Sequence, residues 1–252
     1  MKKVIYTVLT GNYDRLQQPS VTDPAYDYVC FTDRPGARDG VWELRPIPYE
    51  GSAVMRARYA KLHPQELLPG YDLSVFMDAN LCITGAGFYE RVNACEAPYA
   101  VLDHCVRDCV WEELRYCYLK DKMGTAAALH WHKELKQMQM PRHFGLAETN
   151  VLVRRHGAES VRDLDRCWWE LLLLSGGTRD QLAFTPSLHR LGLSMPPWLL
   201  GPGRNARNVA CLAYTLHPAT GKENVPGRLN WANLVYNLRL LWRKAVLRLC
   251  LK

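Results

Sequence analysis

The 252-residue sequence lacks any apolar run of the roughly 18–20 residues that a membrane-spanning helix needs. It also lacks the pattern of a signal peptide, because the apolar stretch after Lys2 and Lys3 ends at Gly11 without a small-residue cleavage site. Internal repeats and low-complexity tracts are missing too, which excludes repeat architectures. We therefore expect a cytoplasmic, globular protein.

A regular cysteine framework is absent as well. The nine cysteines are odd in number and scattered, and several lie within apolar runs. This pattern favours free, buried thiols over disulfides. His104, Cys105 and Cys109 lack the second ligand pair that a zinc site needs, so the spacing gives little support to structural zinc.

Acidic residues are scarce at the C-terminal end. Residues 201–252 hold nine Lys/Arg and one acidic residue, Glu223, whereas the first 200 residues are close to neutral. Within 228–252, apolar residues that include Trp231 and Trp242 recur at helical spacing beside basic ones. Such a helix can lie in an anionic membrane interface or pack its apolar stripe onto the domain. The charge is confined to this helix, so we expect no nucleic-acid partner.

Short β-rich apolar runs alternate with helical segments along the rest of the chain. The expected strands span residues 3–10, 26–32, 42–47, 73–77, 99–103 and 149–153, and the expected helices span 55–67, 108–122, 125–139 and 164–175. This alternation predicts an α/β fold with a mostly parallel central sheet, in which ligands bind beyond the carboxyl ends of the strands. We assign 1–200 to one Rossmann-like domain, 201–227 to a surface loop and 228–252 to a basic amphipathic helix.

Polar residues follow the first two expected strands. Thr10, Gly11 and Tyr13 follow the first strand, and Asp33 follows the second. Glycine allows a ligand to approach the backbone, tyrosine can stack on a base, and the carboxylate can accept from a base or a ribose hydroxyl. These residues are candidates for holding a nucleoside, and two ordinary turns are the alternative.

Asp78 and Asn80 directly follow the buried run 73–77. Two oxygen-bearing side chains two residues apart can hold a divalent cation that is bound to a diphosphate, although a turn that caps a helix would look the same. Arg56, Arg58 and Lys61 on the expected helix can add positive charge there, or they can lie on a solvated face.

Three further polar groups are candidates for chemistry on a sugar. Asp180 and Gln181 begin a helix after a Gly-Gly break and can flank an anomeric carbon, although Asp180 can equally act as an N-cap. Glu148 and Asn150 lie at a strand start and can hold sugar hydroxyls. One residue of the polar cluster His104, Arg107, Glu112 and Glu113, at and within the start of a helix, can act on an acceptor hydroxyl, although a surface helix with ion pairs is the alternative.

The ordered series of motifs resembles a former domain-of-unknown-function family that is grouped with plant mucilage-related glycosyltransferases. This resemblance implies a GT-A fold, a nucleotide-sugar donor and a role in polysaccharide synthesis. It covers about residues 4–190. The motifs are Tyr6-Thr7-x-x-x-Gly11-x-Tyr13-Asp14, Phe31-Thr32-Asp33, Trp42, Arg56-x-Arg58-x-x-Lys61, Asp78-x-Asn80, His104-x-x-Arg107-x-Cys109-x-x-Glu112-Glu113, Trp168-Trp169 and Arg179-Asp180-Gln181.

A more distant similarity is to glycosyltransferase family 8, and it implies transfer with retention of configuration. The metal motif of that family is Asp-x-Asp, and Asp78-Ala79-Asn80 departs from it by an amide at the last position. Glu148-Thr149-Asn150 and Asp180-Gln181 resemble two further motifs of the family. His217 is similar to its C-terminal metal ligand, with altered spacing to the following Gly and Lys.

Together these features predict a glycosyltransferase that uses a nucleotide-diphosphate sugar, expected to be UDP-linked, with Mn²⁺ or Mg²⁺. The metal ligands would be Asp78, Asn80 and His217. The acceptor would be a glycan or a lipid-linked glycan, reached at the inner face of the membrane through 228–252. The rival hypotheses are a metal-dependent amide or lipid hydrolase built around His104, and a non-catalytic module that binds a nucleotide sugar.

Overall fold

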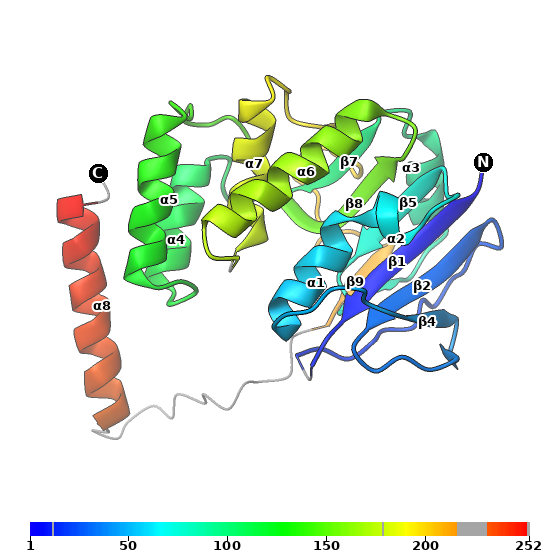
Figure 1. Ribbon diagram of the computed structural model, residues 1–252, viewed down its shortest axis with the longest axis horizontal. Helices are drawn as coiled ribbons and strands as arrows, with labels where there is room; N and C mark the ends of the chain where they lie inside the picture. Colours follow the sequence, from blue (N-terminus) through cyan, green and yellow to red (C-terminus); the bar gives the residue numbers. More distant parts are fainter. Residues whose placement is uncertain (12, 178, 216–230, 251–252) are drawn as a thin grey trace.

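A computed structural model describes residues 1–11, 13–177, 179–215 and 231–250 (Figure 1). Its centre is a seven-stranded sheet, with a separate two-stranded sheet beside it. In spatial order the large sheet consists of β3 (Arg38–Asp39), β4 (Trp42–Pro46), β2 (Tyr26–Thr32), β1 (Lys3–Leu9), β5 (Leu73–Met77), β8 (Ala147–Arg155) and β7 (Tyr99–Asp103). The small sheet pairs β6 (Leu81–Ile83) with β9 (Leu212–Tyr214).

The four strands β4, β2, β1 and β5 run parallel, whereas β8 is antiparallel to both of its neighbours. The α/β fold with a mostly parallel central sheet is therefore confirmed, and its organisation is the Rossmann-like one that the sequence predicts. Because β1 lies between β2 and β5, the ends of these three strands meet at one edge of the sheet.

Eight helices are described around the sheet (Figure 1). They are α1 (Ala53–Leu62), α2 (Pro64–Leu67), α3 (Gly87–Ala94), α4 (Val110–Leu119), α5 (Thr125–Gln137), α6 (Glu159–Leu174), α7 (Asp180–Arg190) and α8 (Trp231–Cys250). The expected helix over 55–67 is split at His63, because the residue before a proline is disfavoured in helical geometry.

The sheet buries apolar side chains on both faces. Along β1, Val4 and Tyr6 belong to one core cluster and Ile5 belongs to the other, as the alternation of a strand requires. The first cluster also takes side chains from α1 and from α4 to α7, and the second takes them from α3, β6 and β9. All nine cysteines are free, as the sequence predicts.

The segment expected as a surface loop is more ordered than the sequence suggests over its described part, residues 201–215. It contains β9, which pairs with β6, and it buries Asn205 and Ala206. The glycines and asparagines of this segment predict turns. The burial of the residues between them depends on tertiary contacts, which leave no local pattern in the sequence. Residues 216–227 lie outside the described part of the chain.

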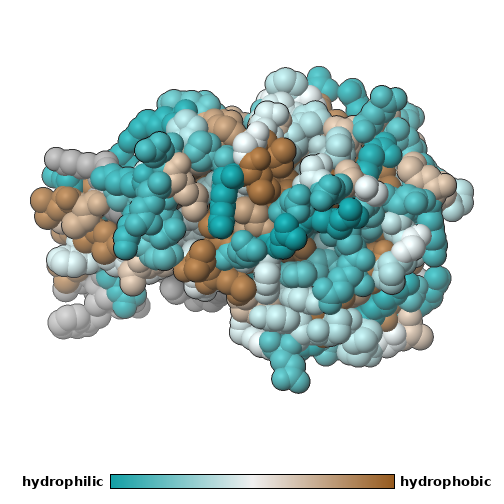
Figure 2. All heavy atoms as spheres, turned by 45° about the horizontal axis from the view of Figure 1, so that its top comes forward, coloured by the Kyte–Doolittle hydropathy of each residue, from teal (hydrophilic) through white to brown (hydrophobic). Residues whose placement is uncertain are grey.

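The C-terminal helix α8 packs against α4 (Figure 1). Val246 and Leu247 join the first core cluster, and Arg243 donates to the carbonyl of Met123 at 3.0 Å. The packing that the sequence left as one alternative is therefore present. Within the described residues, none of the helices is long and apolar enough to cross a bilayer. On the face in Figure 2, apolar side chains form separate patches among hydrophilic ones.

Candidate functional site

The turns after β1 and β2 are joined by one hydrogen bond. Gly11 donates from its backbone N to Oδ2 of Asp33 at 2.8 Å, and its φ of +62° favours glycine. The other oxygen, Oδ1 of Asp33, is buried and accepts no hydrogen bond from the described residues. One oxygen of this carboxylate therefore joins the two strand ends, and the other lies 3.8 Å from Nε of Arg34.

The same turn is tied to the start of α1. Thr10 donates from Oγ1 to the carbonyl of Ala53 at 2.8 Å. Tyr13 is 60% exposed. Partial burial and Asp14 raise the pKa of Tyr13, while Arg179 and Arg58 act in the opposite direction. This tyrosine, the candidate for stacking on a base, therefore lies close to two guanidinium groups.

A buried ion pair links α1 to the start of α7. Nζ of Lys61 lies 2.6 Å from Oδ2 of Asp180, and Nη1 of Arg58 lies 3.1 Å from the same oxygen. Lys61 is 2% exposed and Asp180 is 6% exposed. Burial alone would raise the pKa of Asp180, but Arg58, Lys61 and Arg179 outweigh it and hold the carboxyl ionised, with its pKa below the usual range.

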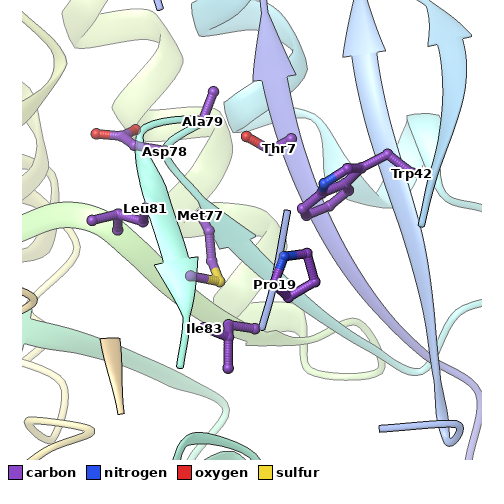
Figure 3. A pocket seen from close by; sticks show the side chains of 8 residues that line it. All are labelled: Thr7, Pro19, Trp42, Met77, Asp78, Ala79, Leu81 and Ile83. Atoms are coloured by element: carbon purple, nitrogen blue, oxygen red, sulfur yellow. The ribbon is translucent and has the colours of Figure 1, made fainter. Parts of the chain in front are cut away.

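Asp78 lies beside this ion pair, at the end of β5. Burial raises its pKa, Lys61 and Arg58 lower it, and Asp180 raises it further. Its backbone N donates to the carbonyl of Asn150 at 2.9 Å, so β8 holds the turn. Figure 3 shows Asp78 at a small, mostly apolar hollow, which is lined by Thr7, Pro19, Trp42, Met77, Asp78, Ala79, Leu81 and Ile83.

Asn80 is turned inward, since its side chain is only 3% exposed. It donates from Nδ2 to the carbonyl of Thr215 at 3.1 Å, and its Oδ1 is buried with no hydrogen-bond partner among the described residues. The third predicted metal ligand, His217, lies outside the described residues. Within the part that the structure describes, no group of three or more His, Cys, Asp or Glu side chains is arranged to hold a metal ion.

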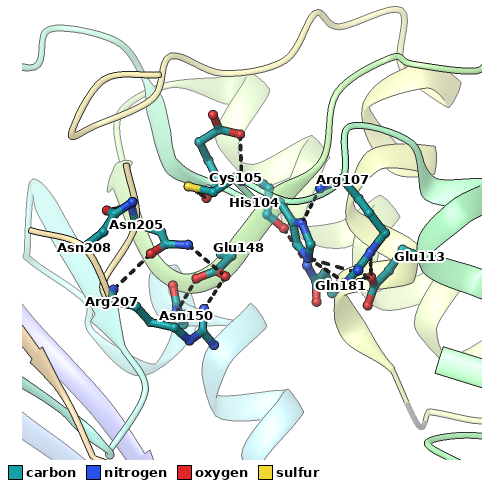
Figure 4. Close-up of polar contacts among 12 residues, drawn as sticks. His104, Cys105, Arg107, Glu113, Glu148, Asn150, Gln181, Asn205, Arg207 and Asn208 are labelled. Carbon is teal, nitrogen blue, oxygen red and sulfur yellow. Dashed lines mark hydrogen bonds and ion pairs between the residues drawn. The ribbon is translucent and has the colours of Figure 1, made fainter. Parts of the chain in front are cut away.

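A second polar cluster surrounds Glu148 (Figure 4). Nδ2 of Asn150 donates to its Oε2 at 3.1 Å, Nδ2 of Asn205 donates to its Oε1 at 3.3 Å, and Arg207 forms an ion pair with it. Burial raises the pKa of Glu148, and Arg207 lowers it as the main opposing influence. The sequence analysis missed Asn205 and Arg207, because both lie in the segment expected to be a loop.

His104 belongs to a third polar group, which Figure 4 shows beside Gln181. Its Nδ1 accepts from the backbone N of Arg107 at 3.1 Å, and Nε of Arg107 donates to Oε2 of Glu113 at 2.7 Å. Burial lowers the pKa of His104, and Glu113 opposes this shift, so the ring stays neutral near pH 7. Gln181 donates to the carbonyl of Ala147 at 2.9 Å, which joins α7 to β8.

The structure thus brings together some, but not all, of the residues that the sequence singled out. Asp78, Asp180, Arg58 and Lys61 act on one another electrostatically. Arg56, two positions from Arg58 on α1, points in a different direction from it, and its buried Nε has no hydrogen-bond partner among the described residues.

Comparison with known proteins adds little to this description of the site. No family model matches the chain, and no curated protein matches it. Among solved structures, the chain is similar to the apo form of the bifunctional glycosyltransferase WbbM, at 11% sequence identity and a TM-score of 0.40. That alignment covers 77% of this chain and 38% of the other, so the chain corresponds to less than half of that protein's length.

Proposed function

We propose that the protein is a glycosyltransferase that moves a sugar from a nucleotide-diphosphate donor, UDP-linked, to a glycan or glycolipid acceptor in surface polysaccharide synthesis. The observation that carries the proposal is the ionised Asp180 with Lys61 and Arg58 beside Asp78, at the carboxyl end of a parallel strand. This edge is where open α/β sheets bind their ligands.

The donor would lie across the ends of β1, β2 and β5. The exposed ring of Tyr13 offers a face for a base, and Oδ1 of Asp33, which lies 3.8 Å from Nε of Arg34, would accept from a ribose hydroxyl or a base N–H. Arg58 and Lys61 would then face the diphosphate, where negative charge grows as the sugar departs.

During transfer, negative charge would develop on the departing phosphate oxygen, close to Arg58 and Lys61. The bond between the anomeric carbon and the phosphate oxygen breaks, and its electron pair stays on that oxygen. The acceptor oxygen forms the new bond to the anomeric carbon, and its proton passes to Glu148, whose raised pKa makes it a better proton acceptor than an exposed carboxylate. Retention of configuration, which the resemblance to family 8 implies, would require the acceptor oxygen to approach the same face of the anomeric carbon that the phosphate oxygen leaves.

At this edge of the sheet a divalent cation would be held by the carboxylate of Asp78, with phosphate and water completing its shell. Asn80, which the sequence offered as a second ligand, has its side chain buried, so its Oδ1 would reach a cation only after turning outward. When bound, Mn²⁺ or Mg²⁺ would neutralise charge on the departing diphosphate. Asp180 serves in this arrangement to position Lys61 and Arg58.

Release of nucleotide from a panel of nucleotide sugars, with Mn²⁺ and a mixture of glycan acceptors, tests the proposal. We expect turnover with a UDP-sugar and a loss of about 100-fold or more in Asp78→Ala, since the cation that would stabilise the leaving diphosphate then loses its carboxylate ligand. The matched control is Arg166→Gln on the exposed face of α6, which should keep full activity. Absence of turnover and of binding with every nucleotide sugar would overturn the proposal, and amide cleavage without nucleotide would favour the hydrolase.

A further inference from the structure

Three cationic groups gather at the start of α7. Arg58 and Lys61 reach it from α1, and Arg179 directly precedes the helix. All three act on the ionised carboxylate of Asp180. Asp78 and Asp14 are further carboxylates that act on the same group.

The two arginines have donors that the described residues leave unused. Nε of Arg58 and Nε of Arg179 are both buried without a hydrogen-bond partner. Arg179 makes no hydrogen bond or ion pair with any other described residue, although its side chain is partly buried. A buried donor without an acceptor costs free energy, and such a group calls for a ligand that accepts.

The turn before α7 depends on a glycine. Gly177 has a φ of +73°, and a Cβ there would lie 2.4 Å from Sδ of Met55, so the turn into α7 requires glycine. This turn brings Arg179 to the beginning of α7, where no side chain caps the helix. The first amides of an uncapped helix add further donors for an anion.

We propose that Arg58 and Arg179 bind the diphosphate of the nucleotide directly, while the buried Lys61 holds Asp180, so that nucleotide binding does not require a divalent cation. The inference rests on the proposed function, and it concerns the mode of donor binding. It adds Arg179 to the binding residues. Tyr13 lies near both arginines, which places a platform for the base next to the diphosphate.

Calorimetric titration of the whole chain with UDP, once in EDTA and once in Mn²⁺, tests this inference without any turnover. We expect UDP to bind in EDTA, and we expect Arg179→Gln to weaken that binding about tenfold, as for the loss of a charge-assisted hydrogen bond. Arg190→Gln is the matched control, since it makes the same change at the opposite end of α7. Arg58→Gln provides a second variant on a different helix.

Binding of UDP only when Mn²⁺ or Mg²⁺ is present would overturn the inference and leave the proposed function intact. An unchanged affinity in Arg179→Gln and Arg58→Gln, or an equal loss in the Arg190→Gln control, would overturn it as well. If UDP binds in neither buffer, both the inference and the proposed function fail.

Discussion

Nζ of Lys61 lies 2.6 Å from Oδ2 of Asp180, and this contact joins α1 to α7 across 119 positions of the chain. Both side chains are buried. The pair therefore fixes the relative position of the two helices that border the proposed donor site. We expect this one interaction to contribute both to stability and to donor binding.

Breaking this pair from either side should be costly. Asp180→Asn leaves two cations without their counter-ion, and Lys61→Met removes the partner that touches Asp180 most closely. We expect each variant to lower the free energy of unfolding by about 3–5 kcal/mol. The double variant Lys61→Met/Asp180→Asn leaves less charge unpaired. Its loss in free energy of unfolding should therefore be smaller than the sum of the losses in the two single variants. Urea unfolding measures all three values, and additive losses would show that the two side chains are not coupled.

The pairing of Glu148 with Arg207 predicts a shift in the pH dependence of transfer. Burial raises the pKa of Glu148 and Arg207 lowers it, so Arg207→Met should raise that pKa further. A base acts in its ionised form, and the acid limb of kcat/KM should therefore move to higher pH in the variant. The same limb should disappear in Glu148→Gln, with UDP affinity largely retained. A limb that stays in place in Arg207→Met would exclude Glu148 as the base.

Burial of His156 predicts a stability change in weak acid. Burial and Arg154 lower its pKa from 6.5 to about 4 against the influence of Asp72, and its Nε2 contacts Oγ of Ser74 at 2.8 Å. The fold thus prefers the neutral ring, whose stabilising contribution is complete above pH 6.5 and is lost as the pH falls toward 4. Melting temperatures between pH 7 and 4 should fall more steeply for the wild type than for His156→Gln. Parallel curves would contradict the prediction.

The strands could be predicted because each carries a local apolar signal. The observed β2 and β5 coincide with the expected 26–32 and 73–77, and β1 differs by one residue at its end. The rule that parallel strands bind ligands at their carboxyl ends then led to Asp33 and Asp78. Local pattern and topology were sufficient to place these two residues at strand ends; their roles in binding stay predictions.

Contacts between distant segments could not be predicted in this way. Nothing near Arg207 in the sequence shows that it will meet Glu148, 59 positions away. The inward orientation of the Asn80 side chain could not be predicted either, since its burial depends on the pairing of β6 with β9. The helix start at Asp180 was predicted, but its partner Lys61 became apparent only when α1 and α7 were brought together.

The outer face of α8 offers a last prediction. Inward-facing Val246 and Leu247 pack on the domain, whereas another face of the helix exposes apolar side chains. These exposed residues are Leu238 (56%), Leu241 (62%), Trp242 (64%) and Leu249 (81%). Lys244 and Arg248 are exposed on the same helix. An apolar face flanked by cations suits the interface of an anionic membrane, and under the proposed function this would bring the protein to a lipid-linked acceptor.

Sedimentation with vesicles that contain an anionic phospholipid measures this binding. We expect the wild type to bind, and binding should weaken at high salt, because screening removes the electrostatic part. Leu241→Gln/Trp242→Ala should release the protein by removing the apolar part. The matched control changes two other exposed apolar residues, Leu173→Gln/Leu174→Gln on α6, and should bind as the wild type does. Equal loss in both double variants would mean that general surface hydrophobicity is responsible, and unchanged binding in both would exclude α8 as the contact.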